Sequence, residues 1–135
     1  MKLIFVENRY KTYFFEQISK RLDDQHDIYW IVQNHAFVPK TGTVLKIPYP
    51  KEKDLSNSFV KNPSIEKIIE SDRQLNYFKK NDKRYFQYYF EHIENLISEI
   101  GPSYVFGEAT AFHELLAIEV CKKREIKYLN PSSCR

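Results

Sequence analysis

Short apolar runs separated by polar turns divide the chain into alternating strands and helices. Leu3–Val6 is a continuous apolar run that stops at Glu7, which is typical of a strand buried on both faces. Between Lys11 and Leu22, apolar residues recur at the helical spacing of Phe14, Phe15, Ile18 and Leu22. Further strands are predicted at Asp27–Gln33, Thr43–Ile47, Tyr104–Gly107 and Lys127–Leu129.

Three more helices are predicted in the second half of the chain. They cover Ser64–Phe78, Asp82–Ile100 and Thr110–Glu125. The middle one has the clearest apolar stripe, which includes Tyr89, Leu96 and Ile97, and Gly101-Pro102 ends it. Strands that alternate with helices predict an α/β fold, an open parallel Rossmann-like sheet of about five strands with helices on both faces.

The length of 135 residues fits a single domain over residues 1–135. The sequence reaches Arg135 soon after the fifth predicted strand, without a closing helix. A doubly wound sheet ordinarily continues at that point, so we expect the chain to be the N-terminal half of a longer enzyme.

Composition narrows the class of protein. The net charge of +3 is mild, and the two cysteines form no CxxC pair, which favours a reduced, cytoplasmic setting. No stretch approaches the roughly 20 apolar residues of a membrane helix. The basic and aromatic stretch over residues 77–86 reads better as a helix face and a polar link than as a nucleic-acid groove. We expect no membrane span, no nucleic-acid partner and no metal.

Open parallel sheets bind ligands beyond the carboxyl ends of their strands. Of the residues expected there, Glu108 is the leading candidate for a general base, since it joins a strand to a helix N-terminus with Thr110 as the expected N-cap. That terminus would favour an anion or oxyanion. The alternative is that Glu108 caps the helix or pairs with Arg9 or Lys11.

Other candidates follow the remaining strands. His35 is the second candidate for proton transfer. His113 stands in the first turn of the last helix, where it could face the cleft or a strand. Arg9 could bind a phosphate or carboxylate, although such arginines more often form surface ion pairs. Asn130, beside Pro131, is mainly a turn signal.

No familiar nucleotide or hydrolase motif is present. Glu7-Asn8-Arg9-Tyr10 stands where a GxGxxG loop would follow the first strand. The sequence also lacks a P-loop, a GxSxG elbow and a cysteine–histidine cluster with zinc spacing.

Three segments together resemble a known family. They are KLIFVENRYKTYFFEQISKRL, WIVQNHAF and GPSYVFGEATAFHELLAIEVCKKREIKYLNPSSCR. They resemble the N-terminal half of bacterial glycosyltransferases with two Rossmann domains (the GT-B type), and the capsular and surface-polysaccharide biosynthesis proteins are the nearest group. The strand, the Gly-Glu-x-Thr turn, the Glu-Leu-Leu helix and the YLNP strand carry the resemblance.

The resemblance implies a division of labour. In such enzymes the N-terminal domain binds the glycan acceptor and often supplies the catalytic base, while a C-terminal domain holds the nucleotide-sugar donor. It implies Glu108 and then His35 as the base, with Asn8, Arg9, Thr110 and Asn130 lining the acceptor cleft. It implies no cofactor in this domain, an inactive fragment when the second domain is missing, and leaves peripheral membrane association open.

Two other classes remain open at this point. The chain could be a self-contained flavodoxin-like module that binds a nucleotide or phosphate. It could also be a non-catalytic interaction domain, which a large exposed aromatic face and obligate dimerisation would favour.

Overall fold

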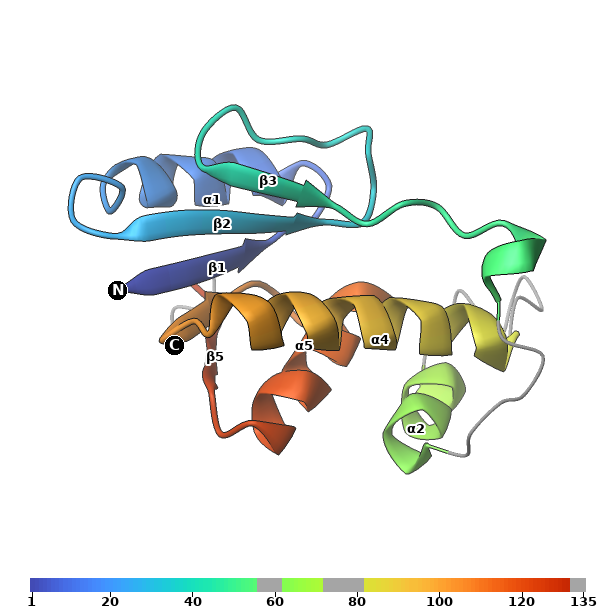
Figure 1. Ribbon diagram of the computed structural model, residues 1–135. Helices are drawn as coiled ribbons and strands as arrows, with labels where there is room; N and C mark the ends of the chain where they lie inside the picture. Colours follow the sequence, from blue (N-terminus) through green and yellow to red (C-terminus); the bar gives the residue numbers. More distant parts are fainter. Residues whose placement is uncertain (56–61, 72–81, 132–135) are drawn as a thin grey trace.

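A computed structural model of the chain describes residues 1–55, 62–71 and 82–131. Within these residues it contains one five-stranded sheet, in the order β3-β2-β1-β4-β5, and all four strand pairs are parallel. Figure 1 shows β3, β2 and β1 side by side. The strands are β1 Lys2–Val6, β2 Asp27–Val32, β3 Thr43–Lys46, β4 Tyr104–Phe106 and β5 Lys127–Leu129. The predicted α/β class and open parallel sheet are confirmed.

Helices cover both faces of the sheet. α1 Lys11–Lys20 lies on one face, and α4 Lys83–Ile100 and α5 Phe112–Lys123 lie on the other, with α2 Pro63–Ser71 packed against them (Figure 1). A short 3-10 turn, η1 Glu52–Asp54, follows β3. The part of the predicted Ser64–Phe78 helix beyond Ser71 lies outside the described residues.

Local sequence explains where these helices begin and end. The Asn62 side chain accepts a hydrogen bond from the Ser64 N–H (3.0 Å) at the start of α2. Asp82 accepts one from the Arg84 N–H (3.0 Å) at the start of α4, so both helices begin with a side-chain cap. Gly101 ends α4 in the left-handed conformation (φ 61°), which glycine adopts without a steric penalty.

Alternate residues of β1 face two separate hydrophobic cores. Ile4 and Val6 contact the core under α4 and α5, which contains Tyr89, Ile93 and Ile97. Leu3 and Phe5 contact the smaller core under α1, which contains Phe15 and Trp30. The strand is therefore buried on both faces, as its continuous apolar run predicts.

Phe14 and Leu96, both in predicted helical stripes, are less buried than expected. Phe14 is exposed, because the buried face of α1 is formed by Thr12, Phe15, Glu16 and Ser19. Leu96 is half-buried at the edge of the core that Ile97 fills. None of the helices in the described part of the chain is both long and apolar enough to cross a membrane.

Candidate functional site

The switch point of this sheet lies between β1 and β4. The chain runs outward from β1 through β2 to β3, then returns to place β4 on the other side of β1. In a doubly wound sheet, the crevice beyond the carboxyl ends of two such strands is the usual ligand site. Here that edge carries residues 7–12 after β1 and residues 107–114 after β4.

Asn8 joins the two loops of the switch point. Its side-chain amide lies 2.8 Å from Glu114 Oε1, 3.0 Å from Thr110 Oγ1 and 3.3 Å from Glu108 Oε2. Since an amide has two N–H groups, these three acceptors share them. Asn8 and Thr110, both predicted to line the cleft, thus contact each other. Asn8 also contacts Glu108.

The buried carboxylate of Glu108 lies beside the half-exposed ammonium group of Lys11. The Glu108 side chain is 5% exposed and its Oε1 accepts a hydrogen bond from Lys11 Nζ, while the Lys11 side chain is 53% exposed. The pairing with Lys11 is one of the alternatives that the sequence left open. A carboxylate in this position can accept a proton or a hydrogen bond from a ligand hydroxyl once the lysine moves aside.

Glu114 satisfies the backbone at the start of α5. Its Oε2 accepts from the Glu108 N–H (2.7 Å) and its Oε1 from the Ala111 N–H (3.0 Å). The predicted N-cap at Thr110 is therefore wrong: the N-cap is Ala111, and Thr110 Oγ1 instead lies 3.3 Å from Glu114 Oε1. A carboxylate already occupies the positive end of the helix dipole, which weakens this end as a site for another anion.

Glu7 fixes the loop after β1 to the loop after β2. It is fully buried, and its carboxylate accepts from the backbone N–H groups of Arg9 (2.8 Å), Gln33 (3.1 Å) and Asn34 (2.6 Å). Arg9 adopts a left-handed backbone (φ 40°), which is unusual for a non-glycine residue. Glu7 thus stabilises a strained loop at the switch point.

His113 lies behind Glu7 rather than in open solvent. Its Nε2 is 2.6 Å from the Glu7 carbonyl oxygen and 3.7 Å from Glu7 Oε1. Since a carbonyl only accepts, Nε2 carries the proton of this hydrogen bond. Nδ1 is buried, without a hydrogen-bond partner among the described residues. His113 therefore faces the end of β1, one of its two predicted orientations.

The described contacts of His35 are with residues other than those of the Glu108 cluster. The His35 ring lies over the Tyr49 ring, with centroids 4.1 Å apart, and its Nε2 is 2.7 Å from the Ile47 carbonyl oxygen. These partners follow β3, at the far side of β2 from β1 and β4. The described contacts thus tie His35 to the end of β3.

Arg9 and Asn130 occupy the rim of the edge. Arg9 is exposed next to Asn8, and Asn130 is exposed after β5, one strand beyond β4. The structure places both at the predicted edge of the sheet.

Sequence reasoning missed two residues that shape the backbone of Glu108. The Tyr128 hydroxyl donates a hydrogen bond to the Glu108 carbonyl oxygen (2.6 Å). Burial, with the nearby Glu114, Cys121 and Glu108, raises the pKa of Tyr128, so its hydroxyl stays protonated. A Cβ on Gly107 would lie 2.2 Å from that hydroxyl oxygen, so the contact requires glycine. The sequence feature that could have identified Gly107 is its position at a strand end in a chain with only three glycines.

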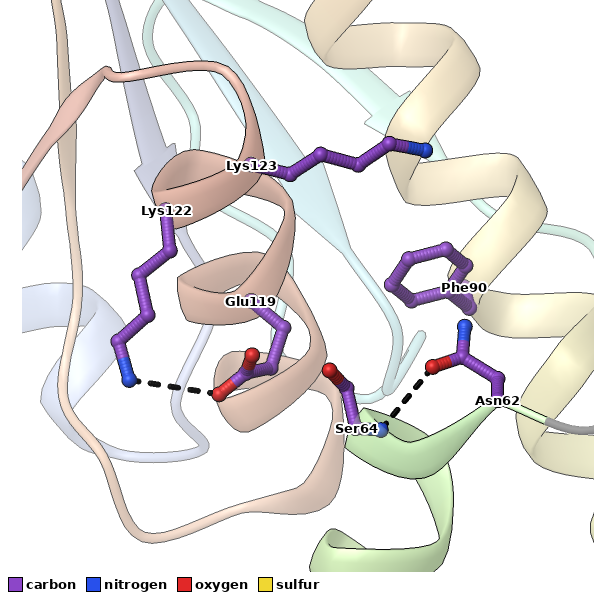
Figure 2. A pocket seen from close by; sticks show the side chains of 6 residues that line it. All are labelled: Asn62, Ser64, Phe90, Glu119, Lys122 and Lys123. Carbon is purple, nitrogen blue, oxygen red and sulfur yellow. Dashed lines mark hydrogen bonds and ion pairs between the residues drawn. The ribbon is translucent and has the colours of Figure 1, made fainter.

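A hollow lies between α2, α4 and α5 (Figure 2). Its volume is about 510 Å³. It is lined by Asn62, Ser64, Phe90, Glu119, Lys122 and Lys123. Lys122 pairs with Glu119 (3.4 Å), and Lys123 pairs with Glu94 (3.1 Å). Both lysines stand at the end of α5 opposite to the one that begins at the switch point, so this hollow is separate from the Glu108 cluster.

Neither a protein-family model nor a curated protein matches the chain. Among residues 1–55, 62–71 and 82–131, no group of three or more His, Cys, Asp or Glu side chains could hold a metal ion. The assignment of a function therefore rests on the geometry of the switch point and on the resemblance in the sequence.

Proposed function

We propose that this chain is the acceptor-side domain of a glycosyltransferase in bacterial surface-polysaccharide synthesis. The observation that carries the proposal is the Glu108 carboxylate, held by Lys11 and Asn8 at the switch point of a parallel sheet. Carboxylate, amide, ammonium and hydroxyl groups converge there, and these are the groups that hydrogen-bond to sugar hydroxyls.

Glu108 would act as the general base. It would take the proton of an acceptor hydroxyl as that oxygen bonds to the anomeric carbon of a nucleotide sugar and the nucleotide leaves with the electron pair of the broken bond. Lys11 occupies Glu108 Oε1 before the acceptor arrives. Because Lys11 is half-exposed, it can swing toward solvent and leave that oxygen to the hydroxyl. His35 remains the second candidate for a base, but it would act at the end of β3 and not within the Glu108 cluster.

The donor side belongs to a second domain in this proposal. A nucleotide sugar would bind there, and Asn8, Arg9, Thr110 and Asn130 would contact the glycan on this side. The fragment alone would then be inactive but would still bind glycans. The proposed setting is the cytoplasm, with peripheral contact to a membrane.

The flavodoxin-like alternative has less support from the site. A phosphate needs N–H donors and cations, yet Glu114 already accepts from the N–H groups of Glu108 and Ala111. Three buried carboxylates, Glu7, Glu108 and Glu114, surround the switch point. Their negative charge opposes a phosphate but suits neutral sugar hydroxyls.

Ligand-observed NMR on the 135-residue chain tests the proposal. Short glycans, free nucleotides and nucleotide sugars are each added to the unchanged protein, to Glu108→Gln and to the control Glu119→Gln. Glu119 is a carboxylate that lines the hollow between α2, α4 and α5 and pairs with Lys122. Glycan binding that is weakened only by Glu108→Gln is the expected result. Tight binding of a bare nucleotide, or glycan binding that ignores Glu108→Gln, would contradict the proposal.

A further inference from the structure

The outer face of α1 presents aromatic rings to solvent. Several exposed residues of α1 and its two ends recur at helical spacing, and we call them the α1 outer face. They are Tyr10, Tyr13, Phe14, Gln17, Lys20 and Arg21. Tyr10 is 78% exposed, Phe14 53% and Tyr13 41%. The helix lies against one face of the sheet (Figure 1). On its opposite side, Phe15 belongs to the core that contains Phe5 and Trp30. The rings of Tyr10, Tyr13 and Phe14 are therefore on the surface and contribute little to the core.

A fourth ring extends this patch. Phe37, in the loop after β2, contacts the Tyr10 ring edge-on with centroids 4.9 Å apart, and its centroid lies 6.5 Å from that of Tyr13. Phe37 is half-buried and joins Tyr10 and Tyr13 into one group of rings. Such a group is uncommon on the surface of a soluble monomer, whereas isolated apolar residues are normal. We therefore expect a binding partner to cover this patch.

The charges around the rings have one sign. Lys20 and Arg21 are exposed at the end of α1, Arg9 before it, and Lys40 in the loop that carries Phe37. The single acid of α1, Glu16, is buried and accepts hydrogen bonds from the backbone N–H groups of Lys40 and Thr41. The next exposed acids along the chain, Asp23 and Asp24, follow the end of the helix.

We infer that the α1 outer face docks this domain on an anionic lipid surface. Tyr and Phe rings favour the boundary between headgroups and acyl chains. Lys and Arg beside them are attracted to anionic headgroups, an attraction that salt weakens. The combination of rings with cations and without an exposed acid complements such a surface in both polarity and charge. This inference rests on the membrane contact in the proposed function, for which it names the surface, but it does not depend on glycosyl transfer at Glu108.

Vesicle flotation of the 135-residue chain tests the inference. The vesicles contain either phosphatidylcholine alone or phosphatidylcholine with phosphatidylglycerol. The variants are Tyr13→Gln with Phe14→Gln, and Lys20→Gln with Arg21→Gln. Glutamine is a good helix former, and circular dichroism checks that each variant is folded. Lys122→Gln with Lys123→Gln is the matched control, since it removes two exposed positive charges from another helix.

Binding is expected only to vesicles with phosphatidylglycerol. Each α1 variant should lower the partition coefficient about tenfold, and the control should change it less than about twofold. Absence of binding, or an equal loss in the control, would overturn the inference. So would a dimer, seen by analytical ultracentrifugation, that Tyr13→Gln with Phe14→Gln abolishes, because a second copy would then cover the patch. Glycan binding measured in parallel separates either failure from a failure of the proposed function.

Discussion

Lys11 and Glu108 are 97 positions apart in the sequence, yet they form an ion pair at the carboxyl edge of the sheet. The pair joins the first turn of α1 to the end of β4, across the switch point. Glu108 is buried and Lys11 is half-exposed, so the lysine is the member of the pair that can leave. This asymmetry underlies both the proposed chemistry and the first prediction.

Removal of the Lys11 ammonium should destabilise the fold. Lys11→Met leaves the buried Glu108 carboxylate without its cation, and we expect the free energy of unfolding to fall by about 1–2 kcal/mol. Adding Glu108→Gln should restore part of the loss, because no uncompensated charge then remains. Urea unfolding measures both, with Lys20→Met on the exposed end of α1 as the control. Equal effects of Lys11→Met and Lys20→Met would contradict the pairing.

Gly107 should be intolerant of a methyl group as long as the Tyr128 hydroxyl is present. The added Cβ would lie 2.2 Å from that oxygen, so Gly107→Ala should cost about 1–3 kcal/mol of stability. In a Tyr128→Phe background the cost should shrink, because the oxygen that clashes is gone. A double-mutant cycle by thermal or urea unfolding gives the coupling energy. Additive effects of the two substitutions would show that the close approach is not there.

Neighbouring residues of α4 should differ sharply in their contribution to the core. Ile97 is fully buried against α5 and the sheet, whereas Leu96 is half-buried at the edge of the core. Ile97→Ala should therefore cost about 2–5 kcal/mol, and Leu96→Ala clearly less. If urea unfolding gave the two variants the same loss, the orientation of α4 would be wrong.

Cys121 should resist thiol reagents while the protein is folded. Burial raises the pKa of its thiol from the ordinary 9.0 to about 12, so little of the reactive thiolate forms near pH 8. Labelling is measured in a Cys134→Ser background, since Cys134 lies outside the described residues. Modification should follow unfolding in urea. Fast labelling of the native protein would contradict the burial of Cys121.

The same pKa shift predicts how stability depends on pH. Above about pH 9 the unfolded chain loses the thiol proton and the folded chain keeps it, so the stability from Cys121 falls as the pH rises, by up to about 1.4 kcal/mol per unit. The loss ends as the pH passes the folded pKa of about 12. Comparison with Cys121→Ala isolates this contribution from other groups that ionise there. Identical pH profiles would count against the shift.

The apolar pattern predicted the fold because a strand that is buried on both faces is a continuous apolar run in the sequence. The continuous run at Leu3–Val6 agrees with β1 to within one residue, and the strand at Lys127–Leu129 agrees without adjustment. The edge of the sheet that carries the polar cluster also followed from strand order. These features depend on local periodicity, which a single sequence contains.

The contacts inside the site depend on tertiary geometry, so the sequence pattern predicts them less well. Thr110 is a good N-cap by residue type, but Glu114 reaches back to the N–H groups of Glu108 and Ala111, so α5 begins later, at Phe112. Glu7 follows an apolar strand like any surface acid, and only the fold brings the N–H groups of Gln33 and Asn34 within its reach. Buried carboxylates that bind backbone groups cannot be recognised from spacing alone.

The most direct measurement of the central claim is a map of amide chemical shifts during titration of the chain with short glycans. We expect the largest shifts at the switch point, in the loops of Asn8 and Glu108. Glu108→Gln should weaken them, while Glu119→Gln should not. Shifts centred instead on the hollow of Phe90 and Lys123, or shifts that are unchanged in Glu108→Gln, would contradict the proposal that this edge of the sheet binds a glycan acceptor.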